Sequence, residues 1–135
     1  MHDSPVRPPR ILVVDDERPN RQLFEVMLAP EGFAIQTAAS GEEALALVAQ
    51  QPPDLILLDV MMPRMDGYQV AAALKGDPAT QRIPVILVTG LDDQAVRALV
   101  RDAGAEDFLA KPVDRADLCL RVKNLLLARS GWACT

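Results

Sequence analysis

Directly after four apolar runs, this sequence places residues that together could transfer a phosphoryl group. Asp15 and Asp16 follow the run ILVV, Asp59 follows LILL, Thr89 follows VILV, and Lys111 follows FLA. Carboxylates that lie close together raise each other's pKa unless a cation binds between them, and oxygen ligands suit Mg²⁺. An ammonium group suits phosphate oxygens. The set therefore predicts a site at which Asp59 attacks phosphorus and forms an aspartyl phosphate.

Alternating strand and helix patterns must bring these residues together. Short apolar runs predict five strands: Ile11–Val14, Phe33–Thr37, Leu55–Asp59, Pro84–Thr89 and Ala105–Ala110. Helical periodicity predicts five helices: Arg18–Ala29, Gly41–Gln50, Gly67–Lys75, one that reaches Asp102, and Asp114–Ala128. Repeated strand–helix units predict an α/β fold, a doubly wound parallel five-stranded sheet with helices on both faces. Ligands bind such sheets at the carboxyl ends of the strands, where the four polar positions fall.

Capping residues predict where three of these helices begin. Ser40, with Glu43 three residues later, predicts an N-cap and a capping box. Asp66 is the predicted cap of the helix Gly67–Lys75, and Asp92-Asp93 is the predicted cap of the helix that follows Thr89. We assign no chemistry to these aspartates.

The overall composition favours one acidic, globular domain. The 135 residues are 50% hydrophobic, with a net charge of −5 and a pI of about 4.8, which disfavours direct binding to nucleic acid or to anionic membranes. No apolar run approaches the roughly 20 residues that span a bilayer. Residues 1–9 are the predicted flexible arm, 10–129 the domain, and 130–135 a tail or the start of a linker.

Histidine and cysteine usage excludes other site classes. The only histidine is His2, in the arm, which argues against a histidine-based metal site or a Ser-His-Asp triad. Cys119 and Cys134 lack CxxC spacing and favour a reduced, cytoplasmic protein over a disulfide scaffold. Cys119 is most simply a packing residue of the last helix.

Four motifs resemble those of the two-component response regulator receiver domain. They are ILVVDDE, DLILLDVMMPRMDG, IPVILVTG and GAEDFLAKPVD, in the order and spacing of that family, and the resemblance covers about residues 10–128. It implies a flavodoxin-like (βα)₅ fold with strand order 2-1-3-4-5. It also implies a signalling phosphoacceptor, a phosphoprotein of a phosphorelay that catalyses only its own phosphorylation and dephosphorylation.

The resemblance assigns the acidic residues to a phosphoacceptor site. Asp59 would accept the phosphoryl group from a sensor histidine kinase or a phosphotransfer protein. Asp16, Asp59 and the backbone carbonyl of Met61 would bind Mg²⁺, for which Mn²⁺ can substitute, and Asp15 would hold a metal-bound water.

The resemblance also assigns the phosphate contacts and the switch. Thr89, Gly90 and Lys111 would contact phosphoryl oxygens. Thr89 with Phe108 would form the switch pair, in which the hydroxyl moves toward the phosphate and the aromatic ring turns inward. The Lys111–Pro112 peptide bond would be cis, which the reduced trans preference of proline permits.

Switching would alter the face made by the helix after residue 93, the strand Ala105–Ala110 and the last helix. That face would signal to an output domain or a downstream protein, and LKGDPATQRIPVILVTGLDD and RVKNLLLAR are similar to receivers fused to cyclic-di-GMP enzymes. The mixed charges of this face would suit a homodimer or only solvation. They are Arg97, Arg101, Asp107, Arg115 and Arg121.

The chain departs from commoner family members at four positions. Phe108 stands where tyrosine is frequent, and Gly90 where alanine is common. Met61 and Leu91 stand where smaller or polar residues are often found. We predict that these two apolar side chains restrict attacking water and prolong the phosphorylated state.

Other interpretations remain open at this point. Asp15-Asp16 could be only a helix cap, and Phe108 only a core residue. A haloacid-dehalogenase-type phosphatase also uses a strand-end aspartate, but its acid/base aspartate would fall at Met61, which cannot transfer a proton. A nucleotide or flavin module lacks support because GxGxxG and GxxxxGK[ST] are absent. A degenerate receiver that acts only as a binding module is the remaining alternative.

Overall fold

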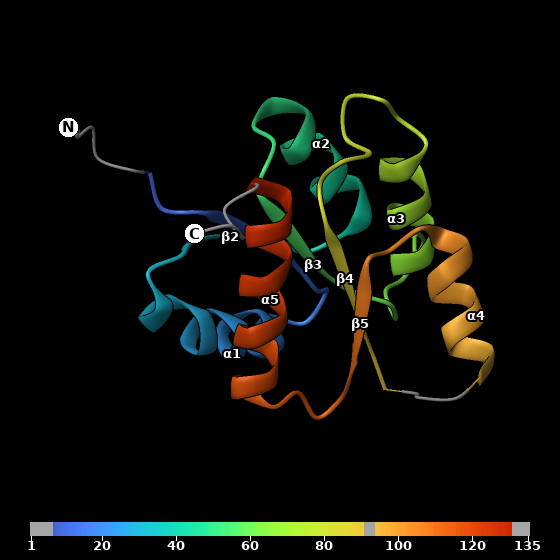
Figure 1. Cartoon of the computed structure of the whole chain (residues 1–135). Helices are drawn as coiled ribbons and strands as arrows, with labels where there is room; N and C mark the ends of the chain where they lie inside the picture. Colours follow the sequence, from blue (N-terminus) through green and yellow to red (C-terminus); the bar gives the residue numbers. More distant parts are fainter. Residues whose placement is uncertain (1–6, 91–93, 131–135) are drawn as a thin grey trace.

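A computed structural model describes residues 7–90 and 94–130, which form one α/β layer structure (Figure 1). Its single sheet has five parallel strands in the order β2-β1-β3-β4-β5. The strands are β1 (Arg10–Val14), β2 (Ala34–Ala38), β3 (Leu55–Asp59), β4 (Val85–Thr89) and β5 (Asp107–Ala110). This confirms the predicted fold class and strand order.

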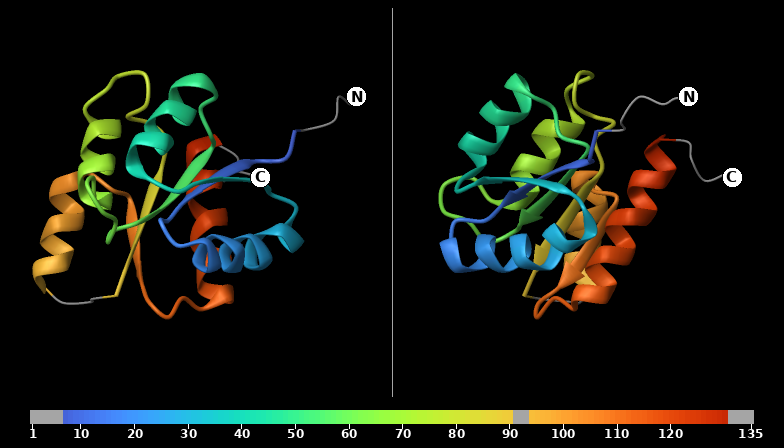
Figure 2. Two further views of the ribbon diagram at one scale, coloured as in Figure 1. Left: turned by 180° about the vertical axis from the view of Figure 1, so that it is seen from behind. Right: turned by 90° about the vertical axis from the view of Figure 1, so that its left-hand side faces the viewer.

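Five α-helices cover both faces of the sheet, as predicted. They are α1 (Arg18–Leu28), α2 (Gly41–Gln50), α3 (Gly67–Lys75), α4 (Gln94–Ala103) and α5 (Arg115–Ser130). One buried cluster joins the sheet to α2, α3 and α4, and the other joins it to α1 and α5. Figure 2 shows α5 across the sheet from α2 and α3. None of the described helices is long and apolar enough to cross a membrane.

The central strands are apolar on both faces because helices cover both of them. Every residue of β3 and β4 is buried, and so are the last four of β1. Continuous burial explains why these runs read as blocks of Val, Ile and Leu rather than as an alternating pattern. It also means that any charged residue at a strand end stands at the boundary of a dry core.

Several predicted element boundaries shift by one or two residues. Helix α1 ends at Leu28, one residue early, and continues as a 3₁₀ turn, η1 (Ala29–Glu31), before Gly32 adopts a left-handed φ of 88°. Strand β5 begins two residues late because the Ala105 N–H closes α4 by donating to Val100 O. Strand β2 lies one residue later than predicted, and α5 extends two residues beyond Ala128.

The predicted helix caps are confirmed where the structure describes them. The Ser40 hydroxyl accepts from Glu43 N at 3.1 Å, but Glu43 Oε1 accepts from Ala39 N at 2.7 Å rather than from Ser40 N, so the capping-box prediction was wrong in that half. Asp66 caps α3 with a complete capping box. The predicted cap Asp92-Asp93 lies outside the described residues, as do residues 1–6 of the predicted arm and 131–135 of the predicted tail.

Gly67 fixes how closely α3 approaches the end of β3. A Cβ atom at Gly67 would lie 2.4 Å from the carbonyl oxygen of Asp59 and 2.8 Å from Cα of Val60. The Gly67 N–H donates to Val60 O at 2.9 Å, which locks the contact. The backbone that carries Asp59 is therefore held directly by the first residue of α3.

Candidate phosphoacceptor site

The carboxyl ends of four neighbouring strands bring the predicted site residues to one edge of the sheet. In the sheet register Val14 pairs with Leu58, Asp59 with Val88, and Thr89 with Ala110. Asp15 and Lys111 directly follow β1 and β5, so all four positions lie on adjacent strands. β2, the strand without an ionisable end, lies at the outside of this group.

Three carboxylates meet at this edge. Asp15, Asp16 and Asp59 each offer an oxygen, and these oxygens all lie within 4.8 Å of one another. Asp15 is 0% exposed and Asp59 4%, whereas Asp16 is open to solvent. A group of three oxygen ligands with one solvent-accessible member fits a hard divalent cation that keeps part of its water shell.

Asp15 is buried with one oxygen unused. Its Oδ1 accepts from Glu17 N at 2.9 Å and lies 3.5 Å from Asn20 Nδ2. Its Oδ2 accepts no hydrogen bond from any described residue. Burial raises the pKa of the Asp15 carboxyl, and the charge of Asp16 raises it further. An unused, buried carboxylate oxygen is the donor that a cation or a metal-bound water would satisfy, so the residues present fit Mg²⁺.

Asp59 and Lys111 form an ion pair. Lys111 Nζ lies 3.0 Å from Asp59 Oδ1. Burial raises the pKa of Asp59, and the charges of Asp15 and Asp16 add to that effect against the opposing contact of Lys111. Burial lowers the pKa of Lys111, but the contact with Asp59 and the charges of Asp59 and Asp15 outweigh it, so that pKa is raised. The lysine stays protonated beside carboxylates that carry more charge than one cation offsets.

The remaining predicted site residues follow the ends of β3, β4 and β5 along the chain. Thr89 is buried, and Gly90 is exposed with nothing within 4 Å of the place where a Cβ would stand. Met61 is 73% exposed, and Leu91 lies outside the described residues. The Lys111–Pro112 peptide bond is cis, as predicted.

Phe108 lies two residues before Ala110, on the face of the sheet that α4 covers. It packs against the cluster of that face, beside its strand partner Leu87. The guanidinium carbon of Arg97, in α4, lies 5.8 Å from the centre of its ring. The sequence placed Phe108 on this strand, as found. It did not predict the contact with Arg97, because Arg97 was interpreted only as one charge of a mixed surface.

Two residues of α1 were not among the predicted site residues. Arg21 Nη1 donates to the backbone carbonyl of Asp15 at 2.8 Å, and Asn20 Nδ2 donates to Glu17 Oε1 at 3.0 Å while approaching Asp15. Both tie the loop after β1 to the first turn of α1. The sequence pattern that could have revealed them is their spacing. Asn20 and Arg21 lie five and six residues after Asp15, in a helix that begins soon after the strand ends.

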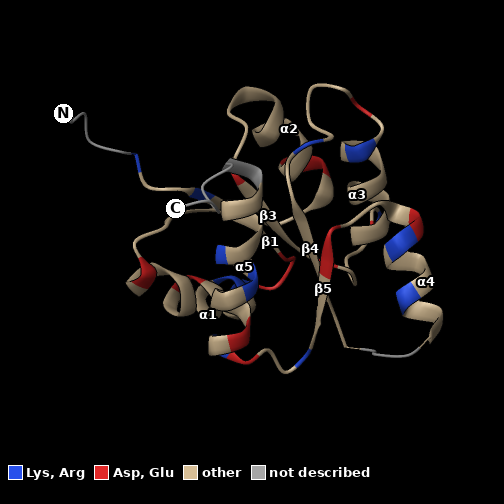
Figure 3. Cartoon of the chain, in the orientation of Figure 1, with Lys and Arg blue, Asp and Glu red and all other residues tan. Residues whose placement is uncertain are grey.

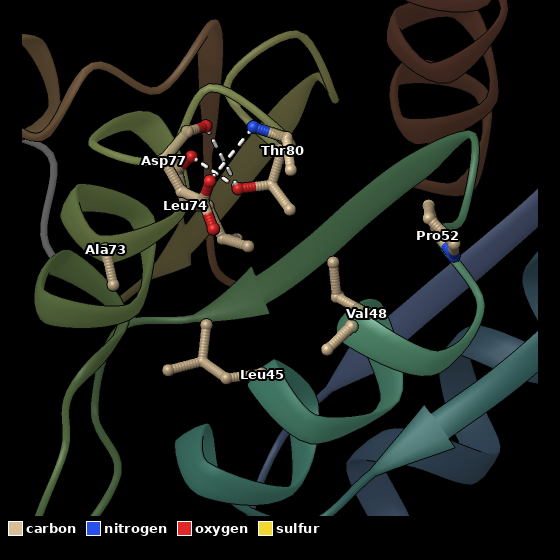
Figure 4. Close-up of a pocket in the computed structure, with 9 residues that line it drawn as sticks. Leu45, Val48, Pro52, Ala73, Leu74, Asp77 and Thr80 are labelled. Atoms are coloured by element: carbon tan, nitrogen blue, oxygen red, sulfur yellow. Dashed lines mark hydrogen bonds between the residues drawn. The ribbon is translucent and has the colours of Figure 1, made fainter.

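A pocket lies between α2 and α3, at the edge of the sheet opposite the candidate site (Figure 4). It has a volume of about 420 Å³ and a mainly apolar lining that includes Leu45, Val48 and Leu74. The Thr80 hydroxyl at its wall donates to Leu74 O at 2.7 Å. This pocket contains none of the acidic residues described above, so it is separate from the candidate site.

Comparisons with known proteins agree with this geometry. Residues 11–123 match the family model of the response regulator receiver domain. The chain is 50% identical over 116 residues to response regulator PleD of Caulobacter vibrioides, covering 86% of this chain and 26% of PleD. It is 42% identical over 117 residues to the probable transcriptional regulator ycf27 of Cyanophora paradoxa, covering 87% of this chain and 48% of that protein.

Solved structures repeat the fold. A putative response regulator of Chloroflexus aurantiacus superimposes with a TM-score of 0.85 at 36% identity, covering 88% of this chain and 98% of that one. The chain therefore matches a complete solved receiver-sized chain, but it spans only a quarter to a half of the two curated relatives named above, 26% and 48%.

Proposed function

The chain belongs to the response regulator receiver domain family, and on that premise we propose that Asp59 accepts a phosphoryl group in a reaction that needs Mg²⁺. One observation carries the proposal: Asp59 is buried, its carboxylate lies within 4.8 Å of oxygens of Asp15 and Asp16, and Lys111 lies 3.0 Å away. Few structural roles would justify gathering three carboxylates at the end of a dry core. Receiver domains are signalling phosphoacceptors.

In the proposed reaction a carboxylate oxygen of Asp59 attacks the phosphorus of a phosphohistidine. The new P–O bond forms as the P–N bond breaks, and the imidazole leaves with the electron pair. Lys111 exchanges part of its pairing with Asp59 for a phosphoryl oxygen, which its 36% side-chain exposure permits. The Thr89 hydroxyl and Gly90 are the proposed further contacts of the phosphoryl oxygens.

The proposed cation site uses Asp16 and Asp59 directly, with the carbonyl of Met61 as a third ligand and Asp15 acting through water. When bound, Mg²⁺ would neutralise charge that develops on the phosphoryl oxygens, and Mn²⁺ would substitute for it. The unused Oδ2 of Asp15 supports this assignment.

Acetyl phosphate with Mg²⁺, followed by intact-mass measurement, tests the function. We expect one phosphate adduct on the wild type and none on Asp59→Asn. Asp77→Asn is the matched control, because Asp77 is an exposed aspartate that precedes β4, at the opposite edge. Absence of an adduct on the wild type would favour a binding module without phosphorylation, and steady release of phosphate without an adduct would favour a phosphatase.

The proposed phosphoryl donor is a histidine kinase or a phosphotransfer protein, and we propose that it docks on the surface of α1 beside Lys111. A shallow pocket of about 190 Å³ lies there between α1 and the loop after β5, lined by residues that include Leu23, Lys111 and Pro112. Leu23 is 51% exposed and Val26 70%. Exposed aliphatic groups beside the reacting pair suit an apolar helix of the donor.

This docking surface predicts a difference between two phosphoryl sources. Leu23→Asp should slow transfer from a phosphorylated histidine phosphotransfer domain and leave labelling by acetyl phosphate unchanged. Equal transfer to the variant and the wild type would remove α1 from the proposed docking surface.

We propose that the face of α4, β5 and α5 passes on the signal; this face carries both basic and acidic residues (Figure 3). Leu99 of α4 and Leu120 of α5 are 46% and 59% exposed on these helices. We propose that this face binds an output domain or a downstream protein, including one linked to cyclic-di-GMP, or a second copy of the chain. Sedimentation with and without beryllofluoride, a phosphoryl analogue, tests the dimer: an unchanged monomer would exclude it. The cysteine usage favours a cytoplasmic setting.

A further inference from the structure

Phe108 is held by two arginines that come from different helices. From α5, Arg121 Nη1 donates to Phe108 O at 3.1 Å and to Asp107 Oδ1 at 2.7 Å. The same Asp107 oxygen accepts from Phe108 N at 2.8 Å. From α4, Arg97 covers the ring at 5.8 Å from its centroid. Figure 1 shows α4 and α5 on either side of β5.

These two contacts restrict different parts of the residue. Arg121 and Asp107 fix the N–H and the carbonyl of Phe108, and Asp117 holds Arg121 in turn through Nε at 2.9 Å. The backbone at this position is therefore clamped. The ring has no polar atom, so its orientation depends on packing and on the cation above its face. These hydrogen bonds favour a movement of Phe108 that involves its side chain more than its backbone.

The ring lies where such a movement would reach the candidate site. Thr89 pairs with Ala110, and Leu87 pairs with Phe108, so Thr89 and Phe108 are diagonal neighbours on one face of the sheet. Phe108 is only half-buried, and the exposed Arg97 contacts it on the solvent side. A ring that turned toward Thr89 and the core would lose the guanidinium.

We propose that Arg97 is a positioning residue that holds the Phe108 ring in its half-buried position beneath the guanidinium, which we call its outward orientation, and thereby makes the phosphorylated state, with the ring turned inward, harder to reach. The inference rests on the proposed function, because it concerns the same phosphoryl-dependent switch. Phenylalanine has no hydroxyl that could anchor the ring, so the contact with the guanidinium is the polar contact that the structure shows for it.

The expected change in beryllofluoride affinity follows from the free energy of the cation–π contact. A contact present in only one of two states shifts the equilibrium by its own free energy, and an exposed cation–π contact corresponds to roughly a two- to fivefold change in population. A ligand that binds the inward state gains the same factor when the contact is removed. Arg97→Gln should therefore bind beryllofluoride with Mg²⁺ roughly two- to fivefold more tightly than the wild type.

The experiment combines affinity with a direct view of the ring. The protein is labelled with fluorophenylalanine, which gives one fluorine resonance for each of its 3 phenylalanines, and Phe108→Leu assigns the one from Phe108. Beryllofluoride and Mg²⁺ are titrated into the wild type, Arg97→Gln and Arg101→Gln. Arg101 is the matched control because it lies one turn further along α4 and is also exposed.

We expect Arg97→Gln to shift the Phe108 resonance before any ligand is added and to raise beryllofluoride affinity, and Arg101→Gln to do neither. In a Phe108→Leu background, Arg97→Gln should leave the affinity unchanged. Three results would each overturn the inference and leave the phosphoacceptor role intact. The first is equal beryllofluoride affinity of the wild type and Arg97→Gln, and the second is an equal gain in affinity in Arg101→Gln. The third is a gain in affinity from Arg97→Gln that persists in the Phe108→Leu background. A wild type that does not bind beryllofluoride would overturn both.

Discussion

The two edges of the sheet each have a lysine close to carboxylates, but they differ in how fully the hydrogen-bonding groups around that lysine are paired. At the amino edge Lys75 Nζ donates to Ile83 O at 2.7 Å, Gln81 O at 3.0 Å and Glu106 Oε2 at 2.7 Å. The other oxygen of Glu106 accepts from Val85 N at 2.8 Å. This group, Lys75 with its partners, is the amino-edge clamp, and every strong donor and acceptor in it is used.

At the carboxyl edge Lys111 is the cation nearest to Asp59, and the oxygens outnumber the donors. Asp15 Oδ2 has no partner among the described residues, and burial raises the pKa values of both Asp15 and Asp59. The amino edge therefore uses its charges to join α3, β4 and the loop before β5. The carboxyl edge leaves charge unsatisfied, an arrangement that would favour a bound cation and that destabilises the fold without one.

The test with the largest expected effect asks whether the backbone at the carboxyl edge is rigid, even though the carboxylates there lack hydrogen-bond partners. Gly67→Ala would push a Cβ to 2.4 Å from the Asp59 carbonyl, and backbone cannot yield as a flexible side chain can. We expect the free energy of unfolding to fall by about 3 kcal/mol, measured by urea denaturation. Gly90→Ala, with open space around its Cβ, should change it little. A tolerated Gly67→Ala would mean that the backbone under Asp59 is adaptable, so that the two edges differ less than their contacts indicate.

The second test breaks the amino-edge clamp. Lys75 has a side chain that is only 14% exposed, so Lys75→Met should leave two carbonyls and Glu106 without their donor and lower the free energy of unfolding by about 2 kcal/mol. The matched control is Lys123→Met, because Lys123 pairs with Glu31 at the surface and should lose much less. Phosphorylation of Lys75→Met by acetyl phosphate should persist under conditions in which the variant is folded. Equal losses in the two variants would show that the clamp is ordinary surface pairing.

The third test concerns a substitution at the carboxyl edge that should stabilise the protein, unlike the first two. Asp15→Asn removes a buried charge and places an amide donor near the neighbouring carboxylates, so we expect the free energy of unfolding to rise by about 1–2 kcal/mol at neutral pH. Mg²⁺ affinity should fall at the same time. Asp16→Asn, at an exposed position, should lose Mg²⁺ affinity without comparable stabilisation. A destabilised Asp15→Asn would mean that the carboxylate at this edge is satisfied after all.

The pH dependence of that gain follows from the raised pKa of Asp15. In the folded protein this pKa is above the ordinary value of 3.8, so the neutral carboxyl is favoured on folding. Its favourable contribution is complete below pH 3.8 and is lost as the pH rises through the folded value. The stabilisation by Asp15→Asn should therefore be largest at neutral pH and should shrink as the pH falls toward 3.8, which urea denaturation across pH measures.

The sequence predicted those parts of the molecule that depend on local pattern. Apolar runs located the strands, and the parallel topology then required their polar ends to share an edge, which brought Asp15, Asp59 and Lys111 together as predicted. Caps such as Asp66 are also local and were found. The fold and the candidate site therefore follow from short stretches of sequence together with the geometry of parallel sheets.

The contacts that the sequence did not predict depend on side-chain direction across long separations. The amino-edge clamp joins Lys75 to Glu106, 31 residues away, and Arg97 reaches Phe108 from another element. Each of these residues reads locally as a solvated surface charge. Glu43 is a smaller case, since its carboxylate accepts from the Ala39 N–H rather than from the neighbouring donor that the capping pattern implied.

The last test concerns water rather than charge, and its expected effect on stability is the smallest. Met61 is 73% exposed beside Asp59, so Met61→Asn should leave the free energy of unfolding nearly unchanged. A polar side chain there would admit and orient the attacking water, and we expect dephosphorylation, followed by intact mass after removal of acetyl phosphate, to quicken by roughly threefold to tenfold, a barrier change of about 1 kcal/mol. Met61→Leu keeps an apolar chain and should keep hydrolysis slow. An unchanged rate in Met61→Asn would show that other groups control the access of water to the phosphoryl group.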